Sequence, residues 1–329
     1  MFKYCVKRIL LAVGILFGVS VLLYGLIRNI DMNVLWSQIP SNAGLDAAAE
    51  YKRLASLYGL GDDSFLGICK GYLTWLGNFM KGDLGTSIKY KQPVEDVIFK
   101  NMGVSFVISL VALVLQLIIA IPLGIKCACN QYGKLDYAAT FLTMIGISFP
   151  TFFFGSIMIK LFAVDLGWFP AQGLETANLP MDTSQWDQFW DMVWHLILPM
   201  TTLVVLSIGS WSRYTRTNTL EVLNADYIRT ARAKGLSEHS VIYKHVFRNS
   251  LIPLVTVLAG TLPSLFGGAM ITETIFAIPG IGKIAYDAMT AGDIPFIMGY
   301  NMFIAVLTVI GILLTDLMYA VVDPRVKLA

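Results

Sequence analysis

Long apolar stretches separated by polar segments dominate the chain. A helix needs about 20 apolar residues to cross the hydrocarbon core of a bilayer, and six stretches approach or exceed this length. They are Ile9–Ile27, Val104–Ile125, Ala138–Val164, His195–Trp211, Leu251–Thr272 and Met302–Val322. The fourth is the shortest, and we expect its helix to extend a few residues in either direction. The pattern predicts an all-α, polytopic membrane protein with about six transmembrane helices.

Positive charges alternate from one side of these stretches to the other. Short cytoplasmic loops carry an excess of Lys and Arg, and such residues gather at both ends of the chain and after the second and fourth stretches. They are Lys3, Lys7, Arg8, Lys126, Lys134, Arg213, Arg216, Arg229, Arg232, Lys234, Lys244, Arg248, Arg325 and Lys327. The segment 165–194 has no Lys or Arg, and the segment 273–299 has only Lys283. This alternation predicts that both termini are cytoplasmic.

The expected domains follow from these spans. Residues 1–28 form an anchor helix that is retained, because its apolar stretch is longer than that of a signal peptide and no cleavage site follows closely. The segment 29–103 falls on the outer side, since long loops are translocated regardless of charge. Residues 104–329 form a five-helix core that includes a cytoplasmic loop at 213–250.

Part of the outer segment has the spacing of a short amphipathic helix that lies on the membrane or on the spans. Its apolar positions are Phe65, Ile68, Tyr72, Leu73, Trp75, Leu76 and Phe79. The sequence Gly82-Asp83-Leu84-Gly85 then predicts a turn. Aromatic residues crowd the predicted outer edges, which is typical of interfacial anchors. They include Trp168, Phe169, Trp186, Trp190 and Trp194.

The composition agrees with a protein surrounded by lipid. Of the 329 residues, 56% are hydrophobic and 14% are charged, whereas a soluble domain has about 25% charged residues. The net charge of +2 is too small to indicate a nucleic-acid partner.

No residue pattern predicts catalysis or a metal site. Cys127 and Cys129 have no accompanying His or second Cys pair, which favours small apolar residues at a membrane edge over a zinc site. The sequence Gly280-Ile281-Gly282-Lys283 resembles the end of a phosphate-binding loop. It fails that pattern, because Ala277 stands where the first glycine belongs and Ile284 where Ser or Thr must follow Lys. We expect no cofactor, no metal and no ATPase activity in this chain.

Charged residues are rare inside the predicted spans, whereas ion-driven carriers usually bind the coupling ion through such residues. Lys160 lies toward the outer end of the third span, where its side chain can reach the interface. Asp316 lies within the last span, where a helix contact is favoured over an ion path. The energy for any transport is therefore expected to come from a partner.

The loop after the fourth span predicts a pair of helices bent at a glycine. The residues from Glu221 to Ala233 are mostly helix formers that continue the fourth span. Gly235 can adopt the left-handed conformation that ends a helix, and Ser237 can cap a second helix from Glu238 to about Arg248. Pro253 is then expected to open the fifth span. A basic loop that binds anionic lipid is the alternative, but a hairpin is more elaborate than a charge anchor requires.

This loop resembles the EAA loop of ABC importer permeases, in the form found in the dipeptide, oligopeptide and nickel branch. The residues that carry the resemblance are Asp226-Tyr227-Ile228-Arg229-Thr230-Ala231-Arg232-Ala233-Lys234-Gly235-Leu236 and Arg248-Asn249-Ser250-Leu251-Ile252-Pro253. Arg229 occupies the glutamate position of the general pattern, and the interval from Gly235 to Pro253 is longer. Both departures are usual in the peptide branch.

Further motifs extend the resemblance over nearly the whole chain and to the B-type subunit of that branch. They are Gly82-Asp83-Leu84-Gly85-Thr86-Ser87 with Pro93-Val94, Leu166-Gly167-Trp168-Phe169-Pro170 with Gly173, Glu273-Thr274-Ile275-Phe276, Pro279-Gly280-Ile281-Gly282, Asp293-Ile294-Pro295 and Asp323-Pro324-Arg325. Each motif is weak alone, but their order is specific. The resemblance implies the fold of a type I ABC importer permease in a bacterial cytoplasmic membrane.

The resemblance also implies partners. They are a C-type permease homologue, two cytoplasmic ATPases that bind the ATP, and an external solute-binding protein. The helices around Gly235 would dock in an ATPase groove, and ATP-driven closure would switch the spans between inward-open and outward-open states. The implied docking residues are Arg229, Thr230, Ala231, Arg232, Ala233, Lys234, Gly235, Leu236 and Ser237. Ala231 and Gly235 would permit close packing there.

The fifth span is expected to line the translocation pathway, since small residues let helices approach closely and bend in lipid. The candidates are Gly260, Pro263, Gly267, Gly268 and Glu273. Glu273 would lie near the outer mouth; the alternative is a helix-end carboxylate in contact with headgroup water.

Short peptides are the expected cargo. Nickel or another small solute is the alternative within the family, and few His, Cys or acidic residues in the spans disfavour a bare nickel ion. A channel or ion-coupled carrier working alone and an intramembrane enzyme remain as competing hypotheses.

Overall fold

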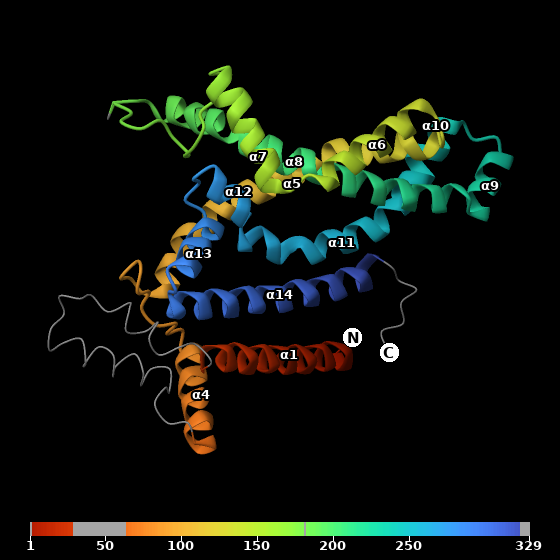
Figure 1. Ribbon diagram of the computed structural model, residues 1–329. Helices are drawn as coiled ribbons and strands as arrows, with labels where there is room; N and C mark the ends of the chain where they lie inside the picture. Colours follow the sequence, from red (N-terminus) through yellow and green to blue (C-terminus); the bar gives the residue numbers. More distant parts are fainter. Residues whose placement is uncertain (1, 29–63, 181, 323–329) are drawn as a thin grey trace. The chain divides into compact units, whose positions relative to one another are not determined.

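The computed structural model describes residues 2–28, 64–180 and 182–322, and every regular element in these ranges is a helix (Figure 1). The bounds are α1 Phe2–Arg28, α4 Phe65–Met80, α5 Val94–Cys129, α6 Lys134–Ser148, α7 Thr151–Met158, η1 Ile159–Asp165, α8 Gln185–Leu223, α9 Asp226–Ala233, α10 Glu238–Ser240, η2 Val241–Val246, α11 Phe247–Gly267, α12 Met270–Ile275, α13 Ile281–Thr290 and α14 Ile294–Val322. The elements η1 and η2 are π-helical.

The helices confirm the number of predicted spans. Four continuous helices are long and apolar enough to cross a membrane, at Lys7–Leu26, Val94–Cys129, Gln185–Leu223 and Ile294–Thr315. Two bent pairs bring the total to as many as six, at Lys134–Ser148 with Thr151–Asp165 and at Glu238–Leu258 with Pro263–Ile275. The chain is therefore a multi-pass membrane protein by length and composition.

The third predicted span is not one helix. It bends by 100° between α6 and α7. Phe149 takes an extended conformation (ψ 124°) directly before Pro150, which precedes the first residue of α7. The residue before a proline is driven out of the helical region by the proline ring, so the apolar run from Ala138 to Val164 is broken at this point.

The fifth predicted span also differs from its expected bounds. The helix that contains it begins before Pro253, and both Pro253 and Pro263 lie inside α11. The prediction that Pro253 opens the span is therefore wrong. The two parts of this span meet at 44°, which agrees with the loss of a backbone hydrogen bond at an internal proline.

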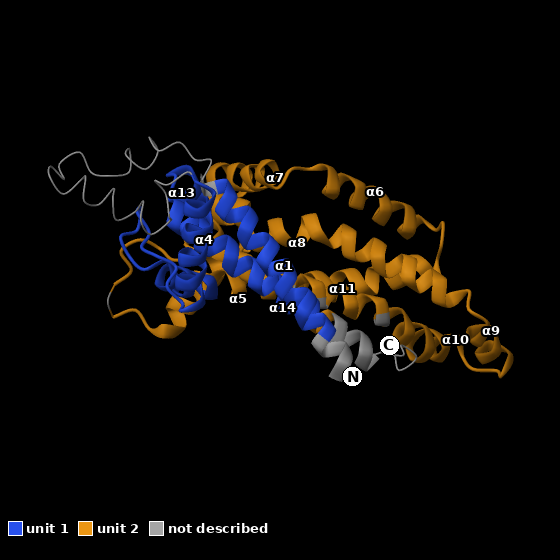
Figure 2. Ribbon diagram, turned by 90° about the horizontal axis from the view of Figure 1, so that it is seen from below, with its two compact units in different colours: residues 1–103, 284–313, 328–329 blue, residues 104–283, 314–327 orange. Residues whose placement is uncertain are grey.

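The contacts divide the chain into two compact units (Figure 2). The first comprises residues 1–103, 284–313 and 328–329, and the second comprises 104–283 and 314–327. The expected division at residue 103 coincides with a unit boundary, whereas the segment 284–313 groups with the first unit. Asp316 and the tail motif at 323–325 lie outside the residues whose side chains are described, as does the segment 29–63.

The predicted amphipathic helix is α4, in the first unit, and Ser64 caps it by accepting a hydrogen bond from Gly67 N at 3.0 Å. Trp75 is buried with Tyr24 of α1 and with the first turns of α14. Four of the predicted apolar positions pack against this cluster: Ile68, Tyr72, Leu76 and Phe79. Phe65 and Leu73 remain exposed, so only part of the predicted apolar face packs against the other helices of this unit.

The loop between α4 and α5 is held by a buried carboxylate of the same unit. Asp293 is 1% exposed and accepts hydrogen bonds from Ser87 Oγ at 2.5 Å, from Lys89 N at 3.0 Å and from Phe296 N at 3.2 Å. Asp293 therefore also caps the start of α14. The pKa of the Tyr90 phenol is raised to about 12. The largest cause is burial, and the nearby carboxylates of Asp287 and Asp293 add to it. The predicted turn at Gly82–Gly85 begins this loop, and both glycines have positive φ.

In the second unit, α8 packs against α6, α7 and α11. One of its buried clusters joins Ile108 of α5, Leu198 of α8, and Phe276 and Ile278 after α12. Lys160 is exposed and pairs with Asp165 at 3.0 Å, so its ammonium group has a partner at the end of η1.

Candidate functional site

The predicted helical hairpin is present between α8 and α11. The helix α8 ends at Leu223, and α9 follows after a turn rather than continuing it. Gly235 has a φ of +75° and donates its N–H to Arg232 O at 2.9 Å. Ser237 Oγ then accepts from Ser240 N at 3.3 Å and caps α10. The left-handed glycine and the serine cap are therefore confirmed, and we call residues 226–246 the Gly235 hairpin.

The second arm of the Gly235 hairpin does not stop near Arg248, as the sequence predicted. The short α10 continues through the π-helical η2 directly into α11. A π-helical turn inserts an extra residue per turn and is common at functional sites. One end of the hairpin is thus continuous with the fifth span.

The Gly235 hairpin has a small core of its own. Ile228 and Ala231 of α9 are buried with Val241 and Val246 of η2, and residues at the end of α8 pack against them. Side chains that are 0–7% exposed fill this core. The expectation that Ala231 allows close packing against a partner is wrong, because its methyl group is already enclosed between the two arms.

The remaining predicted docking residues lie on the surface of the Gly235 hairpin. The exposed ones are Arg229, Thr230, Arg232, Ala233, Lys234, Gly235, Leu236 and Ser237. Three large rings accompany them and were not among the predicted residues. Tyr227 is 50% exposed, and Tyr243, 55% exposed, packs against His239 with ring centroids 4.6 Å apart and ring planes tilted by 35°. Tyr and Arg are enriched at the energetic centres of protein interfaces, so the surface suits a protein partner.

One ion pair spans the bend of the hairpin. Arg232 donates to Glu238 from Nη2 at 2.7 Å and from Nε at 3.2 Å. The hydrogen bonds to this carboxylate hold the pKa of the Arg232 guanidinium above its usual value. Both side chains are about half exposed, so the pair contributes at most about 1 kcal/mol and mainly orients the two arms.

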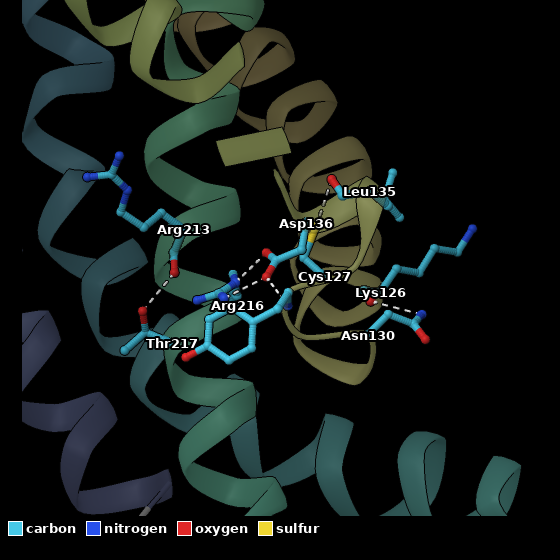
Figure 3. Close-up of polar contacts among 9 residues, drawn as sticks. Lys126, Cys127, Asn130, Leu135, Asp136, Arg213, Arg216 and Thr217 are labelled. Atoms are coloured by element: carbon cyan, nitrogen blue, oxygen red, sulfur yellow. Dashed lines mark hydrogen bonds and ion pairs between the residues drawn. The ribbon is translucent and has the colours of Figure 1, made fainter. Parts of the chain in front are cut away.

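A second, more buried ion pair joins α6 to α8 (Figure 3). Arg216 donates from Nε to Asp136 Oδ1 at 2.6 Å and from Nη2 to Oδ2 at 2.7 Å, and Tyr132 N donates to Oδ2 at 2.9 Å. The Asp136 side chain is 5% exposed. The sequence indicated Arg216 only as a positive loop charge, because nothing in one sequence shows that Asp136, 80 positions earlier, faces it.

We expect Asp136→Asn to destabilise the second unit by roughly 3 kcal/mol, because the Arg216 guanidinium would lose its charged partner in a largely buried position. Thermal unfolding in detergent measures the effect. The double variant Asp136→Leu/Arg216→Met removes both charges and should recover much of the loss. A single variant as stable as the wild type would contradict a structural role for this pair.

The candidate pathway residues of the fifth span lie at and after its bend. Gly260 is exposed, with no other atom within 4 Å of the place a Cβ would take, and Pro263 lies inside α11. Gly267 ends the helix and Gly268 has a φ of +74°. The helix is therefore interrupted between Gly267 and Met270, where α12 begins.

Glu273 occupies a buried polar cage. Its side chain is 1% exposed, so it neither contacts headgroup water nor lines an open passage, and both expectations for it are corrected. Oε1 accepts from Ser105 Oγ at 2.7 Å and from Ala269 N at 3.0 Å, and Oε2 accepts from Lys283 N at 3.0 Å. Ser105 Oγ in turn accepts from Ile281 N at 2.8 Å. The Glu273 carboxylate, held by neutral hydrogen-bond donors, therefore fixes the loop that follows α12.

Three glycines make room for this cage. A Cβ atom at Gly268, Gly280 or Gly282 would lie 2.5–2.8 Å from a carboxylate oxygen of Glu273. The Gly280-Ile281-Gly282 sequence that resembled a phosphate-binding loop therefore wraps a protein carboxylate instead. Sequence reasoning missed this use because Ser105 lies 168 positions from Glu273.

The chain also matches a known family. Residues 120–328 match the family described as binding-protein-dependent transport system inner membrane component. The chain belongs to this family. Over 328 residues the permease is 38% identical to the oligopeptide transport system permease protein AppB of Bacillus subtilis, a match that covers 99% of this chain and 100% of that protein. It is 35% identical over 329 residues to the dipeptide transport system permease protein DppB of Bacillus subtilis, covering 100% of this chain and 99% of that protein.

A third relative extends the comparison to another organism. The permease is 34% identical over 343 residues to the dipeptide transport system permease protein DppB of Alkalihalophilus pseudofirmus, covering 99% of this chain and 100% of that protein. The resemblance drawn from the sequence motifs is thereby confirmed at the level of the family.

Among the described residues, no group of three His, Cys, Asp or Glu side chains is arranged to hold a metal ion.

Proposed function

We propose that this permease is the B-type membrane subunit of an ATP-driven, binding-protein-dependent importer of dipeptides and oligopeptides. The observation that carries the proposal is similarity over 99–100% of the chain to proteins named as oligopeptide or dipeptide transport permeases. The exposed surface of the Gly235 hairpin supports it, because that surface suits a protein partner.

The proposed assembly contains four further parts. A C-type permease homologue completes the pathway, two cytoplasmic ATPase subunits bind and hydrolyse ATP, and an external binding protein delivers the peptide. The permease itself holds no cofactor. Both termini and the Gly235 hairpin face the cytoplasm of a bacterial cell, as the distribution of Lys and Arg favours, and the spans lie in its cytoplasmic membrane.

In this assembly the Gly235 hairpin docks in a groove of an ATPase subunit. The residues around Gly235 face the groove, while the core of Ile228, Ala231, Val241 and Val246 keeps the two arms together. Closure of the ATPases on ATP then moves the hairpin as a body and switches the access of the pathway from one side to the other.

Co-purification and uptake test the proposal. A tagged permease, expressed with its neighbouring subunits and extracted in mild detergent, should emerge with two ATPase subunits. Reconstituted with the binding protein, the complex should take up a labelled dipeptide only when ATP is present on the hairpin side. Recovery without ATPases, or uptake driven by an ion gradient alone, would instead support an autonomous channel or carrier, and uptake of nickel but not of peptides would support the nickel alternative.

A further inference from the structure

One pocket of the second unit combines neutral polar side chains from three spans. It has a volume of about 310 Å³ and lies between α5, α8 and the broken α11–α12 segment. The lining includes Ser109 and Gln116 of α5, Trp211 of α8, and Thr261 and Ser264 of α11. Gly268 and Ala269, the interrupted backbone, close one side. None of the lining side chains carries a charge.

The position of this pocket within the spans limits what can face it. Ser109 and Gln116 fall inside the apolar stretch Val104–Ile125, and Ser264 inside Leu251–Thr272. Polar side chains and non-helical backbone at membrane depth do not face lipid tails; they line water-filled cavities or contact other protein. Ser264 is nonetheless exposed, and Thr261 and Ser109 are half-buried. A partly polar pocket with an exposed hydroxyl at this depth therefore faces water or another protein, and not lipid tails.

The hydrogen bonds already made in the pocket define what it still offers. Ser264 Oγ donates to Thr261 O at 2.6 Å, Thr261 Oγ1 donates to Leu258 O at 2.8 Å, and Gln116 Nε2 donates to Leu203 O at 3.1 Å. These side chains keep oxygen lone pairs that can accept from N–H groups. The Trp211 indole can donate an N–H. Acceptors with a donor beside them match the alternating N–H and C=O groups of a peptide backbone.

The caged carboxylate fixes one wall of this pocket. Ala269 N, which belongs to the pocket-lining backbone, donates to Glu273 Oε1 at 3.0 Å. Ser105, the other partner of Oε1 at 2.7 Å, lies one helical turn before Ser109 on α5. The position of Ser109 relative to the interrupted backbone is thus held by side chains that do not enter the pocket.

We propose that this pocket, through Ser109, Gln116, Thr261 and Ser264, is where the transported peptide hydrogen-bonds to this chain during passage. The inference rests on the proposed function and adds its contact site. The absence of charge from the lining suits a passage, because conduction requires binding weak enough for release. A bare metal ion would meet no carboxylate, thiolate or imidazole ligand in this lining.

The test uses the reconstituted complex with its binding protein and ATPases. The variant Thr261→Val/Ser264→Ala removes two oxygens while nearly keeping side-chain volume. Thr308→Val is the control, since Thr308 makes the same kind of hydroxyl bond to its own helix and does not line the pocket. We expect peptide uptake to fall about fivefold or more in the double variant, with peptide affinity of the binding protein unchanged and Thr308→Val unaffected.

Cysteine labelling provides a second, independent test. Ser264→Cys, in a chain with its four native cysteines replaced, should react with a membrane-impermeant thiol reagent, and a transported peptide trapped with ATP and vanadate should slow this reaction. If Ser264→Cys never reacts, or if the double variant transports like the wild type, the assignment is overturned. If the wild-type complex transports no peptide at all, the proposed function itself fails instead.

Discussion

Replacing Gly235 with aspartate is expected to reduce peptide uptake at least tenfold, while the amount of chain inserted into the membrane stays at the wild-type level. No atom lies within 4 Å of a Cβ built on Gly235, so the new side chain meets no obstacle inside the chain. It points a carboxylate from an exposed surface that also carries Arg229, Arg232 and Lys234. In a docked partner groove that carboxylate would lose its hydration and would reduce the positive charge of this surface. Uptake in proteoliposomes measures the effect.

The φ of +75° at Gly235 calls for a matched control. Asparagine has nearly the shape of aspartate and is the side chain, after glycine, that best tolerates the left-handed region. Gly235→Asn therefore keeps the backbone cost and removes the charge, and it should retain substantial uptake and ATPase co-purification. Wild-type uptake by Gly235→Asp would show that the partner does not dock at this residue.

A second large effect is expected at Gly280. An alanine Cβ there would lie 2.5 Å from both Glu273 Oε2 and Ser105 Oγ. Neither atom can retreat easily, because the carboxylate and the hydroxyl bind each other and the surrounding backbone N–H groups. We expect Gly280→Ala to destabilise the second unit by about 2–4 kcal/mol, through overpacking and the loss of buried hydrogen bonds. Thermal unfolding in detergent and the amount of folded chain in the membrane report it.

Gly260→Ala is the control for this substitution. It makes the same chemical change in the same unit of the chain, but its Cβ would enter open space within α11. Alanine is favoured over glycine inside a helix by up to about 1 kcal/mol, so this variant should be as stable as the wild type or slightly more stable. Equal stability of the Gly260 and Gly280 variants would contradict the cage as described.

The features that can be predicted from the sequence are those set by residues close together in the chain, namely the apolar spans and the Gly235 hairpin. The apolar runs specify the spans because lipid imposes their length, and Gly235 and Ser237 specify the hairpin because a left-handed glycine and a serine cap act within a few residues. The break at Phe149-Pro150 is also readable in principle, since Pro150 restricts the residue before it. The sequence nevertheless predicts one continuous span from Ala138 to Val164, because the length and apolarity of this run count for more than the single proline at 150.

Features that join distant segments cannot be predicted from one sequence. The sequence places Glu273 at the pathway mouth because nothing local shows that Ser105 and the backbone of Lys283 surround it. It assigns Ala231 to a docking surface because a small residue suits close packing with any neighbour, and only the fold shows that the neighbours are Val241 and Val246 of the same hairpin. The pairing of two charges 80 positions apart, between α6 and α8, escapes prediction for the same reason.

The way in which the Gly235 hairpin is attached has a mechanical consequence. Its first arm meets α8 through a short turn, whereas its second arm runs without interruption into α11. A displacement of the residues around Gly235 would therefore pass directly along the second arm into α11, whereas the turn after Leu223 separates the first arm from α8. Two interior prolines, Pro253 and Pro263, lie on that route, and the helix bends by 44° between Leu258 and Pro263. Work done outside the bilayer would thus produce bending at that depth, beside the polar pocket.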